Sequence, residues 1–304
     1  MPRTVTAGLD GSPESLAAAD WAAREALLRD LPLRLVHAAT QQPLVYGPLA
    51  GFTAPVPSAE QQHAAARHLL DEARARVARR HPGLRIDADE IPGQPASALL
   101  KAAEDAELLV LGSRGLSRIA GYLVGSVALS VAAWSTRPVV LVRHDGQTGE
   151  EQPPTGDPAT GTGAHGDVVL GLDLHKPSDP VIEFAFDAAS RRSTHLRVVH
   201  GWTLPPYQYG GDLMPELSAE TAARARSELT DVLRPWQEKY PAVEVHAQAT
   251  IGGAGAHLVD ASRGASLVVV GRHARRAPLG THIGPVTQAL LHHAAAPVAV
   301  ISHA

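Results

Sequence analysis

Residues 108–143 read LLVLGSRGLSRIAGYLVGSVALSVAAWSTRPVVLVR, and the rest of the chain can be interpreted outward from them. They indicate a buried strand over residues 108–111, a glycine-rich loop, a helix that begins at Ser126, and a second buried strand after Pro138. Because glycine has no Cβ, such a loop lets backbone amides approach a phosphate closely. The amides at the start of a helix favour an anion at the same place. In a doubly wound sheet, nucleotide phosphates bind between such a strand and such a helix.

The loop glycines have the spacing Gly112-x2-Gly115-x9-Gly125-Ser126. This spacing resembles, at every defined position, the ATP-binding signature G-x2-G-x9-G-[ST] of the universal stress protein family. A tight turn that needs glycine only for its backbone geometry is the alternative explanation. The full pattern, placed between two strands and a helix, favours phosphate binding.

The composition excludes several classes of function. The chain has 304 residues, 44% hydrophobic and 19% charged, which is typical of globular domains. A net charge of -4 without a long basic run speaks against nucleic-acid binding, and the absence of cysteine excludes disulfides and thiolate ligands. The chain start lacks the apolar core of a signal peptide, and no segment reaches about 18 uninterrupted apolar residues. We therefore expect a cytoplasmic protein with no membrane partner.

The first half of the chain alternates strand and helix patterns, which predicts βαβ crossovers and a parallel sheet. Residues 41–57 contain too many prolines and glycines for a regular element and are a predicted loop. Ser58 and Gln61 predict a capping box for a helix that runs to about Arg80. Strands are predicted at 3–10, 33–38, 84–91, 107–112 and 138–143, of which 84–91 alternates like an exposed edge strand and the last two are apolar throughout.

The second half repeats the first. VVLGLD repeats VTAGLD, LRVVHG repeats LRLVHA, and PVAVIS repeats PVVLVR, at an offset of 163 positions that settles to 159. The segment between the halves is rich in Pro, Gly, Thr and acidic residues, as a linker would be. We predict a first domain at 1–144, a linker at 145–166 and a second domain at 167–304.

The resemblance implies an α/β fold with two tandem flavodoxin-like (Rossmann-like) domains. Each would hold a five-stranded parallel sheet of order 3-2-1-4-5 with helices on both faces. Strand five would be an uncovered apolar edge, which invites pairing. We therefore predict that segments 139–142 and 298–301 cover each other in an intramolecular pseudo-dimer, and two chains associating as a homodimer is a further option that the sequence leaves open.

The resemblance also implies that the first domain binds ATP, with Mg²⁺ carried on the phosphates and no metal ligand from the protein. Asp10 would lie near the nucleotide, and capping of the following helix is an equal alternative that can hold at once. Arg118 could add charge beside the phosphates, and His37 is given no proton-transfer role. The implied binding residues are Gly8, Asp10, Gly11, Ser12, Val36, His37, Leu111, Gly112, Arg114, Gly115, Gly125, Ser126 and Val127.

The second domain departs from the signature at two positions. Ala274 replaces the second glycine, and Pro285 stands where Ser or Thr belongs. Proline has neither the hydroxyl nor an amide proton, so we expect weaker or absent binding there. Arginines 272, 275 and 276 could compensate by charge. The weaker candidate residues are Asp173, Val199, Gly271, Arg272 and Gly284.

The 16 histidines show no recognised zinc-ligand spacing, and the chain lacks both a P-loop and a G-x-S-x-G motif. We therefore expect a nucleotide-responsive regulator in stress response or dormancy, at most a weak ATPase, whose protein partner the sequence does not name. One alternative is an ATP-hydrolysing or nucleotidyl-transferring enzyme of a related α/β superfold. The other is a nucleotide-free protein-interaction module.

Overall fold

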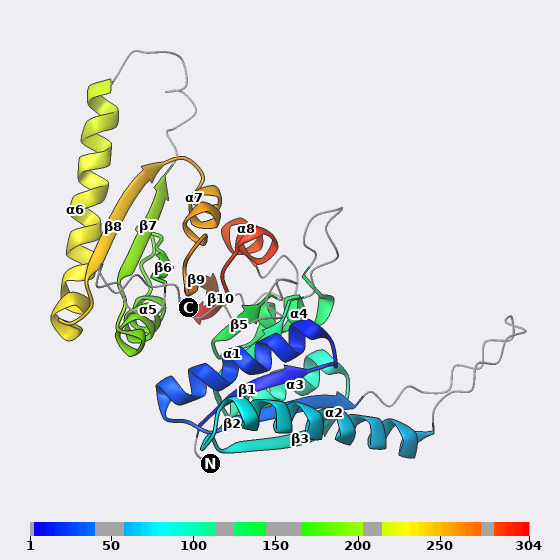
Figure 1. The fold of residues 1–304 in the computed structure, drawn as a ribbon. Helices are drawn as coiled ribbons and strands as arrows, with labels where there is room; N and C mark the ends of the chain where they lie inside the picture. The colour runs from blue at the N-terminus through cyan, green and yellow to red at the C-terminus, as the bar shows by residue number, and fades with distance from the viewer. Residues whose placement is uncertain are drawn as a thin grey trace, which may run out of the picture. The chain divides into compact units, whose positions relative to one another are not determined.

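The structure is a computed structural model, and it contains two compact α/β units (Figure 1). Residues 3–113 and 125–143 belong to the first unit, and residues 166–303 belong to the second. These units are the first and second domains below. The residues that the structure describes are 3–39, 58–113, 124–143, 166–202, 215–274 and 283–303.

The first domain is built on a parallel sheet. Strand β1 pairs with β2 on one side and with β4 on the other, while β3 pairs with β2 and β5 pairs with β4. The order is therefore β3-β2-β1-β4-β5. Strands β1 and β4 are buried at most positions, whereas β3 is mostly half-buried or exposed. The strands are β1 (Thr4–Leu9), β2 (Leu33–Ala39), β3 (Ile86–Pro92), β4 (Ala106–Gly112) and β5 (Val139–Val142).

Helices cover both faces of this sheet. Helices α1 and α2 pack on one face, and α3 and α4 pack together on the other. Helix α1 begins after Ser12, whose hydroxyl accepts from the Ser15 amide, and α2 begins with the predicted capping box of Ser58 and Gln61. The helices are α1 (Pro13–Arg29), α2 (Ala59–Arg80), α3 (Pro95–Glu104) and α4 (Ser126–Trp134).

The second domain repeats this arrangement. Its pairings give the order β8-β7-β6-β9-β10, again all parallel. Helices α5 and α6 pack on one face, with α6 along β8, and α7 and α8 pack on the other (Figure 1). The elements are β6 (Val168–Gly171), α5 (Asp179–Arg192), β7 (Leu196–Trp202), α6 (Pro215–Lys239), β8 (Val245–Ile251), α7 (Ala254–Ala261), β9 (Leu267–His273), α8 (Pro285–His293) and β10 (Val298–His303).

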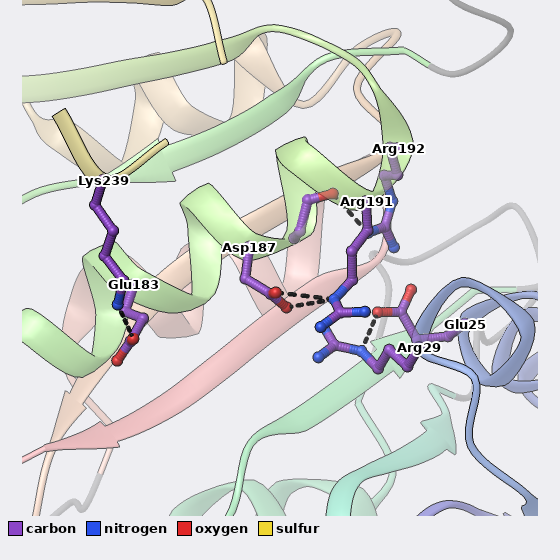
Figure 2. Close-up of polar contacts among 8 residues, drawn as sticks. Glu25, Arg29, Glu183, Asp187, Arg191, Arg192 and Lys239 are labelled. Atoms are coloured by element: carbon purple, nitrogen blue, oxygen red, sulfur yellow. Dashed lines mark hydrogen bonds and ion pairs between the residues drawn. The ribbon is translucent and has the colours of Figure 1, made fainter. Parts of the chain in front are cut away.

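Exposed ion pairs support the helices of the second domain. Figure 2 shows the Arg191 guanidinium donating to both carboxylate oxygens of Asp187 within α5, at 2.8 and 2.9 Å. Lys239 of α6 donates to Glu183 of α5 at 2.6 Å, and this hydrogen bond raises the pKa of the lysine. Lys239 also lies over the rings of Trp236 and Tyr240.

The α/β fold with two parallel sheets is confirmed, as are the five strands and the capping box predicted for the first domain. The predicted loop at 41–57 and most of the predicted linker lie outside the described residues. Within the described residues, no helix has the length and apolarity needed to cross a membrane. The pairing of segments 139–142 and 298–301 stays a prediction.

Candidate functional site

The first domain has a cleft of about 300 Å³ at the carboxyl ends of its central strands. Open α/β sheets bind their ligands at this edge, where the loops that follow neighbouring strands diverge. The ends of β1, β2 and β4 and the starts of α3 and α4 contribute to it. Its lining residues are Gly8, Leu9, Asp10, Ser15, His37, Ala38, Pro95, Leu99, Leu111, Gly112, Gly125, Ser126, Val127 and Ala128.

The start of α4 supplies the donors of this cleft. Gly125 is the N-cap, and no side chain caps the helix. The first intrahelical bond of this turn runs from the Leu129 amide to the Gly125 carbonyl at 2.9 Å. The amides of Ser126 and Val127 precede that bond, so they belong to the group that a helix cannot satisfy internally. With the Ser126 hydroxyl, they form a position suited to an anion.

Asp10 has a capping role and also lines the cleft. Its Oδ1 accepts from the backbone amide of Ser12 at 3.0 Å and from the hydroxyl of the same residue. Ser12 in turn caps α1. The carboxylate therefore supports the helix start, which is the capping role considered for Asp10. The residue also lines the cleft, and its contact with a nucleotide stays a prediction.

Near the end of the second strand of each domain, a histidine makes the same hydrogen bond. His37 Nδ1 lies 2.8 Å from the Leu9 carbonyl oxygen, and His200 Nδ1 lies 2.9 Å from the Leu172 carbonyl oxygen. Because a carbonyl only accepts, Nδ1 carries the proton in both rings. Each bond fixes its imidazole against the end of the first strand, and both histidines line the cleft of their own domain.

Gly112 is required for packing as well as for the loop. A Cβ at this position would lie 2.6–2.7 Å from backbone atoms of Glu14 and Ser15 in α1. The glycine therefore lets α1 approach the end of β4, and that approach closes one wall of the cleft. Gly11 has a φ of 84°, a backbone conformation that favours glycine.

The structure brings together eight of the residues predicted for the first domain, whereas Gly11, Ser12 and Val36 do not line the cleft. Val36 is 1% exposed because its side chain points into the core. Arg114, Arg118 and Gly115 lie outside the described residues. The sequence motifs do not predict Pro95 and Leu99. The strand order could have indicated them, because α3 follows β3 and therefore begins at the same edge of the sheet.

The second domain has a larger cleft, of about 440 Å³, at the equivalent edge. It collects four of the five predicted residues: Asp173, Val199, Gly271 and Gly284. Asp173 repeats one hydrogen bond of Asp10, since its Oδ1 accepts from the amide two residues later, that of His175, at 3.0 Å. The lining residues that sequence reasoning missed include His175, Lys176, Ser178, Trp202, His273, Val286, Thr287 and His303.

Arg272 does not line this cleft, so its predicted contribution of charge there is not supported. Gly271 and His273 line the cleft, and the residue between them in β9 points to the opposite face of the sheet. Arg272 is 5% exposed, and this burial lowers the pKa of its guanidinium. Arginines 275 and 276 lie outside the described residues.

The helix start in the second cleft differs from that in the first. Helix α8 begins with Pro285 after the N-cap Gly284, so one helix amide and the serine hydroxyl are missing. Thr287 is no substitute donor, because its hydroxyl donates to the Gly271 carbonyl at 3.3 Å. The cleft instead carries Lys176 and four histidines. Among the described residues, no lysine or arginine lines the first cleft.

Two buried donors of the second cleft lack partners in the part of the chain that the structure describes. They are the Trp202 indole nitrogen and the Ser178 hydroxyl. Buried polar groups are normally satisfied by protein, water or ligand. The rings of His273 and His303 lie 4.2 Å apart between centroids at the same edge. The second cleft therefore has polar groups of its own and is not a collapsed copy of the first.

The comparisons with known proteins agree with the fold. The sequence profile of the universal stress protein family matches residues 1–143 and 166–302. A universal stress protein of Mycolicibacterium smegmatis is 32% identical over 303 residues, which cover 98% of this chain and 96% of that protein. A universal stress protein structure from Archaeoglobus fulgidus has a TM-score of 0.70 at 17% identity, covering 99% of this chain and 98% of that one. A universal stress protein solved in complex with cAMP is 31% identical, with a TM-score of 0.36, and covers 46% of this chain and 97% of that one.

Proposed function

Because the chain belongs to the universal stress protein family, we propose that it is a cytoplasmic, ATP-binding regulator with one strong nucleotide site, in the first domain. One observation carries the proposal. The first cleft brings Gly112, Gly125, Ser126 and Val127 together beside an uncapped helix start. That arrangement offers donors to a polyphosphate, and within the described residues no side chain caps this helix start.

Each wall of the cleft has a role in the proposed complex. The amides of Ser126 and Val127 and the Ser126 hydroxyl bind the phosphates. The carboxyl ends of β1 and β2, with Asp10 and His37, lie beside the nucleoside, while Leu99 and Leu111 give it an apolar surface. Mg²⁺ arrives on the phosphates, since Asp10 is the only carboxylate among the described residues that line the first cleft.

A regulator is favoured over a catalyst because the described residues that line the first cleft include no arranged acid/base pair. Its histidine is held by a backbone carbonyl, and its carboxylate is engaged by a helix cap. General acid/base catalysis needs such groups placed at the reacting atoms. Hydrolysis over many turnovers that a single acid/base substitution abolishes would instead support the enzyme alternative.

Mass analysis of the nucleotide released from freshly purified protein tests the proposal. We expect ATP, and we expect ATP to stabilise the stripped protein more than AMP or cAMP does, because the helix start recognises a polyphosphate. Ser126→Ala should reduce this stabilisation by ATP, and its matched control is Ser135→Ala, which removes a hydroxyl that donates to the Arg137 carbonyl outside the cleft. No released nucleotide, together with no thermal shift on adding ATP, would support the interaction module instead.

A further inference from the structure

The amino-terminal edge of the second sheet, opposite its cleft, gathers chemistry that the nucleotide site does not use. Asp167, His195 and Glu244 stand directly before the neighbouring strands β6, β7 and β8. The backbone fixes this edge: the Val168 amide donates to the His195 carbonyl at 3.0 Å, and the Leu196 amide donates to the Glu244 carbonyl at 2.9 Å. The three residues are therefore level with one another in the sheet.

Strand alternation adds a fourth residue. Glu244 directly precedes β8 and His246 is the second residue of that strand, so the two side chains, two positions apart along the extended backbone, share one face of the sheet. Leu196 pairs with Val245, which places His195 beside Glu244 on the neighbouring strand. The imidazoles of His195 and His246 meet edge to face with centroids 5.3 Å apart.

The donor atoms of this group have the spacing of metal ligands. His195 Nε2 lies 3.3 Å from one Glu244 carboxylate oxygen, and His246 Nε2 lies 3.4 Å from the other. One ligand atom from each of the three residues lies within 4.8 Å of the other two. Zinc bonds of about 2.0–2.1 Å in a tetrahedron separate neighbouring ligand atoms by about 3.3–3.5 Å. Small side-chain rotations would close the remaining gap.

Asp167 lies beside His195, on the side of the ring away from Glu244. Its Oδ1 lies 3.6 Å from His195 Nδ1, the ring nitrogen that would not bind the metal. A carboxylate at this position orients a ligating histidine and raises its basicity. The Asp167 backbone is itself held, since its carbonyl accepts from the Ser266 amide at 2.9 Å.

We propose that His195, Glu244 and His246 form a zinc-binding site, with Asp167 as the positioning residue. Two imidazoles and one carboxylate are a ligand set that Zn²⁺ accepts, with a fourth position left for water or a further ligand. The side chains of the three ligands are between 36% and 65% exposed, so an ion can enter directly from solvent.

The first domain provides an internal comparison. The same backbone bonds recur there, from the Val5 amide to the Pro32 carbonyl and from the Leu33 amide to the Arg85 carbonyl. Pro32 and Arg85 therefore occupy the places of His195 and Glu244, and Asp87 occupies that of His246. The first domain therefore forms this edge with no histidine at the three positions, and only Asp87 could bind a metal there. Sequence spacing could not reveal it, because its members come from separate strands.

Zinc titration of untagged, metal-stripped, full-length protein against a chromophoric chelator tests the proposal. We expect one equivalent of Zn²⁺ to bind per chain, and His195→Asn with His246→Asn to abolish that binding. Asp167→Asn should weaken it about tenfold or more, as loss of an outer carboxylate does. The control His68→Asn, which alters an exposed histidine beside Glu72 in α2, should change nothing. Unchanged zinc affinity in the double variant would overturn the site.

Chemical protection of the unmutated protein gives a second readout that does not depend on a variant folding. Zinc should shield His195 and His246 from diethyl pyrocarbonate, as mapped by mass spectrometry, while His68 stays reactive. Protection of other histidines instead would refute the assignment.

Discussion

The clefts of the two domains share a backbone plan and differ in what they present to a ligand. The first presents helix amides and the Ser126 hydroxyl, whereas the second presents Pro285 at the same helix start, with Lys176 and histidines around it. Proline is tolerated at the first position of a helix because that amide has no intrahelical partner. The fold therefore does not need the donors that the first cleft keeps. The comparison therefore indicates that the residue after the last glycine of the signature is not needed for folding. We propose that it is needed for ATP binding.

The largest expected effect comes from giving the first domain the residue of the second. Ser126→Pro removes one amide and one hydroxyl while preserving a helix start that α8 already shows to be possible. Each hydrogen bond to a charged phosphate is worth about 1.5–3 kcal/mol, so ATP affinity should fall about a hundredfold or more. Calorimetry on the folded variant measures this.

Ser126→Ala is the matched control for this exchange, because it removes the hydroxyl and keeps the amide. It should cost about tenfold in affinity, clearly less than proline does. If the wild type and the proline variant bound ATP with equal affinity, the phosphates could not bind at the start of α4.

The reverse exchange should produce a smaller gain in the second domain. Pro285→Ser with Ala274→Gly restores the signature, and we expect it to tighten ATP binding there by about tenfold. The remaining differences in lining, above all Lys176 and His273, are not changed by it. The measurement is a titration in the Ser126→Pro background, which isolates the second cleft. If ATP affinity did not increase in that background, the missing amide and hydroxyl at the start of α8 would not be what limits ATP binding in the second cleft.

The smallest expected difference concerns packing at the signature's first glycine. Gly112→Ala would push a Cβ into the backbone of Glu14, which cannot move locally, and should cost about 1–3 kcal/mol of unfolding free energy. Gly271→Ala would meet the His303 ring at 2.7 Å, and a side chain can rotate away. Its cost should lie at the low end, about 1 kcal/mol. Denaturant unfolding of the two variants measures the difference, and a greater loss from Gly271→Ala would contradict this account.

Much of the fold follows from local patterns in the sequence. The buried strands β4 and β5 are continuous apolar runs, and the capping box of Ser58 and Gln61 predicts the start of α2. The central residues of the first cleft can also be predicted from the sequence, because Gly112, Gly125 and Ser126 lie on one short stretch that runs from strand to helix.

The remainder of the sites depends on contacts between distant segments. Leu99 reaches the first cleft only because β3 ends beside β2, and Lys176 reaches the second from a turn with no family signature. The sequence predicts Arg272 as a phosphate partner, but the alternation of side chains along β9 points it away from the cleft, where it is buried. The zinc ligands His195 and Glu244 meet across strands that are far apart in sequence. Such proximity is a property of the sheet and not of any motif.

Calorimetric titration of nucleotide-free wild-type protein with ATP and Mg²⁺ tests the proposed asymmetry most directly. The missing amide and hydroxyl at Pro285 predict one tight site per chain, with any second site at least about tenfold weaker. The Ser126→Pro variant should then lose the tight site. Two equivalent tight sites in the wild type would contradict the account, because Lys176 and the histidines of the second cleft would then replace the missing donors in full.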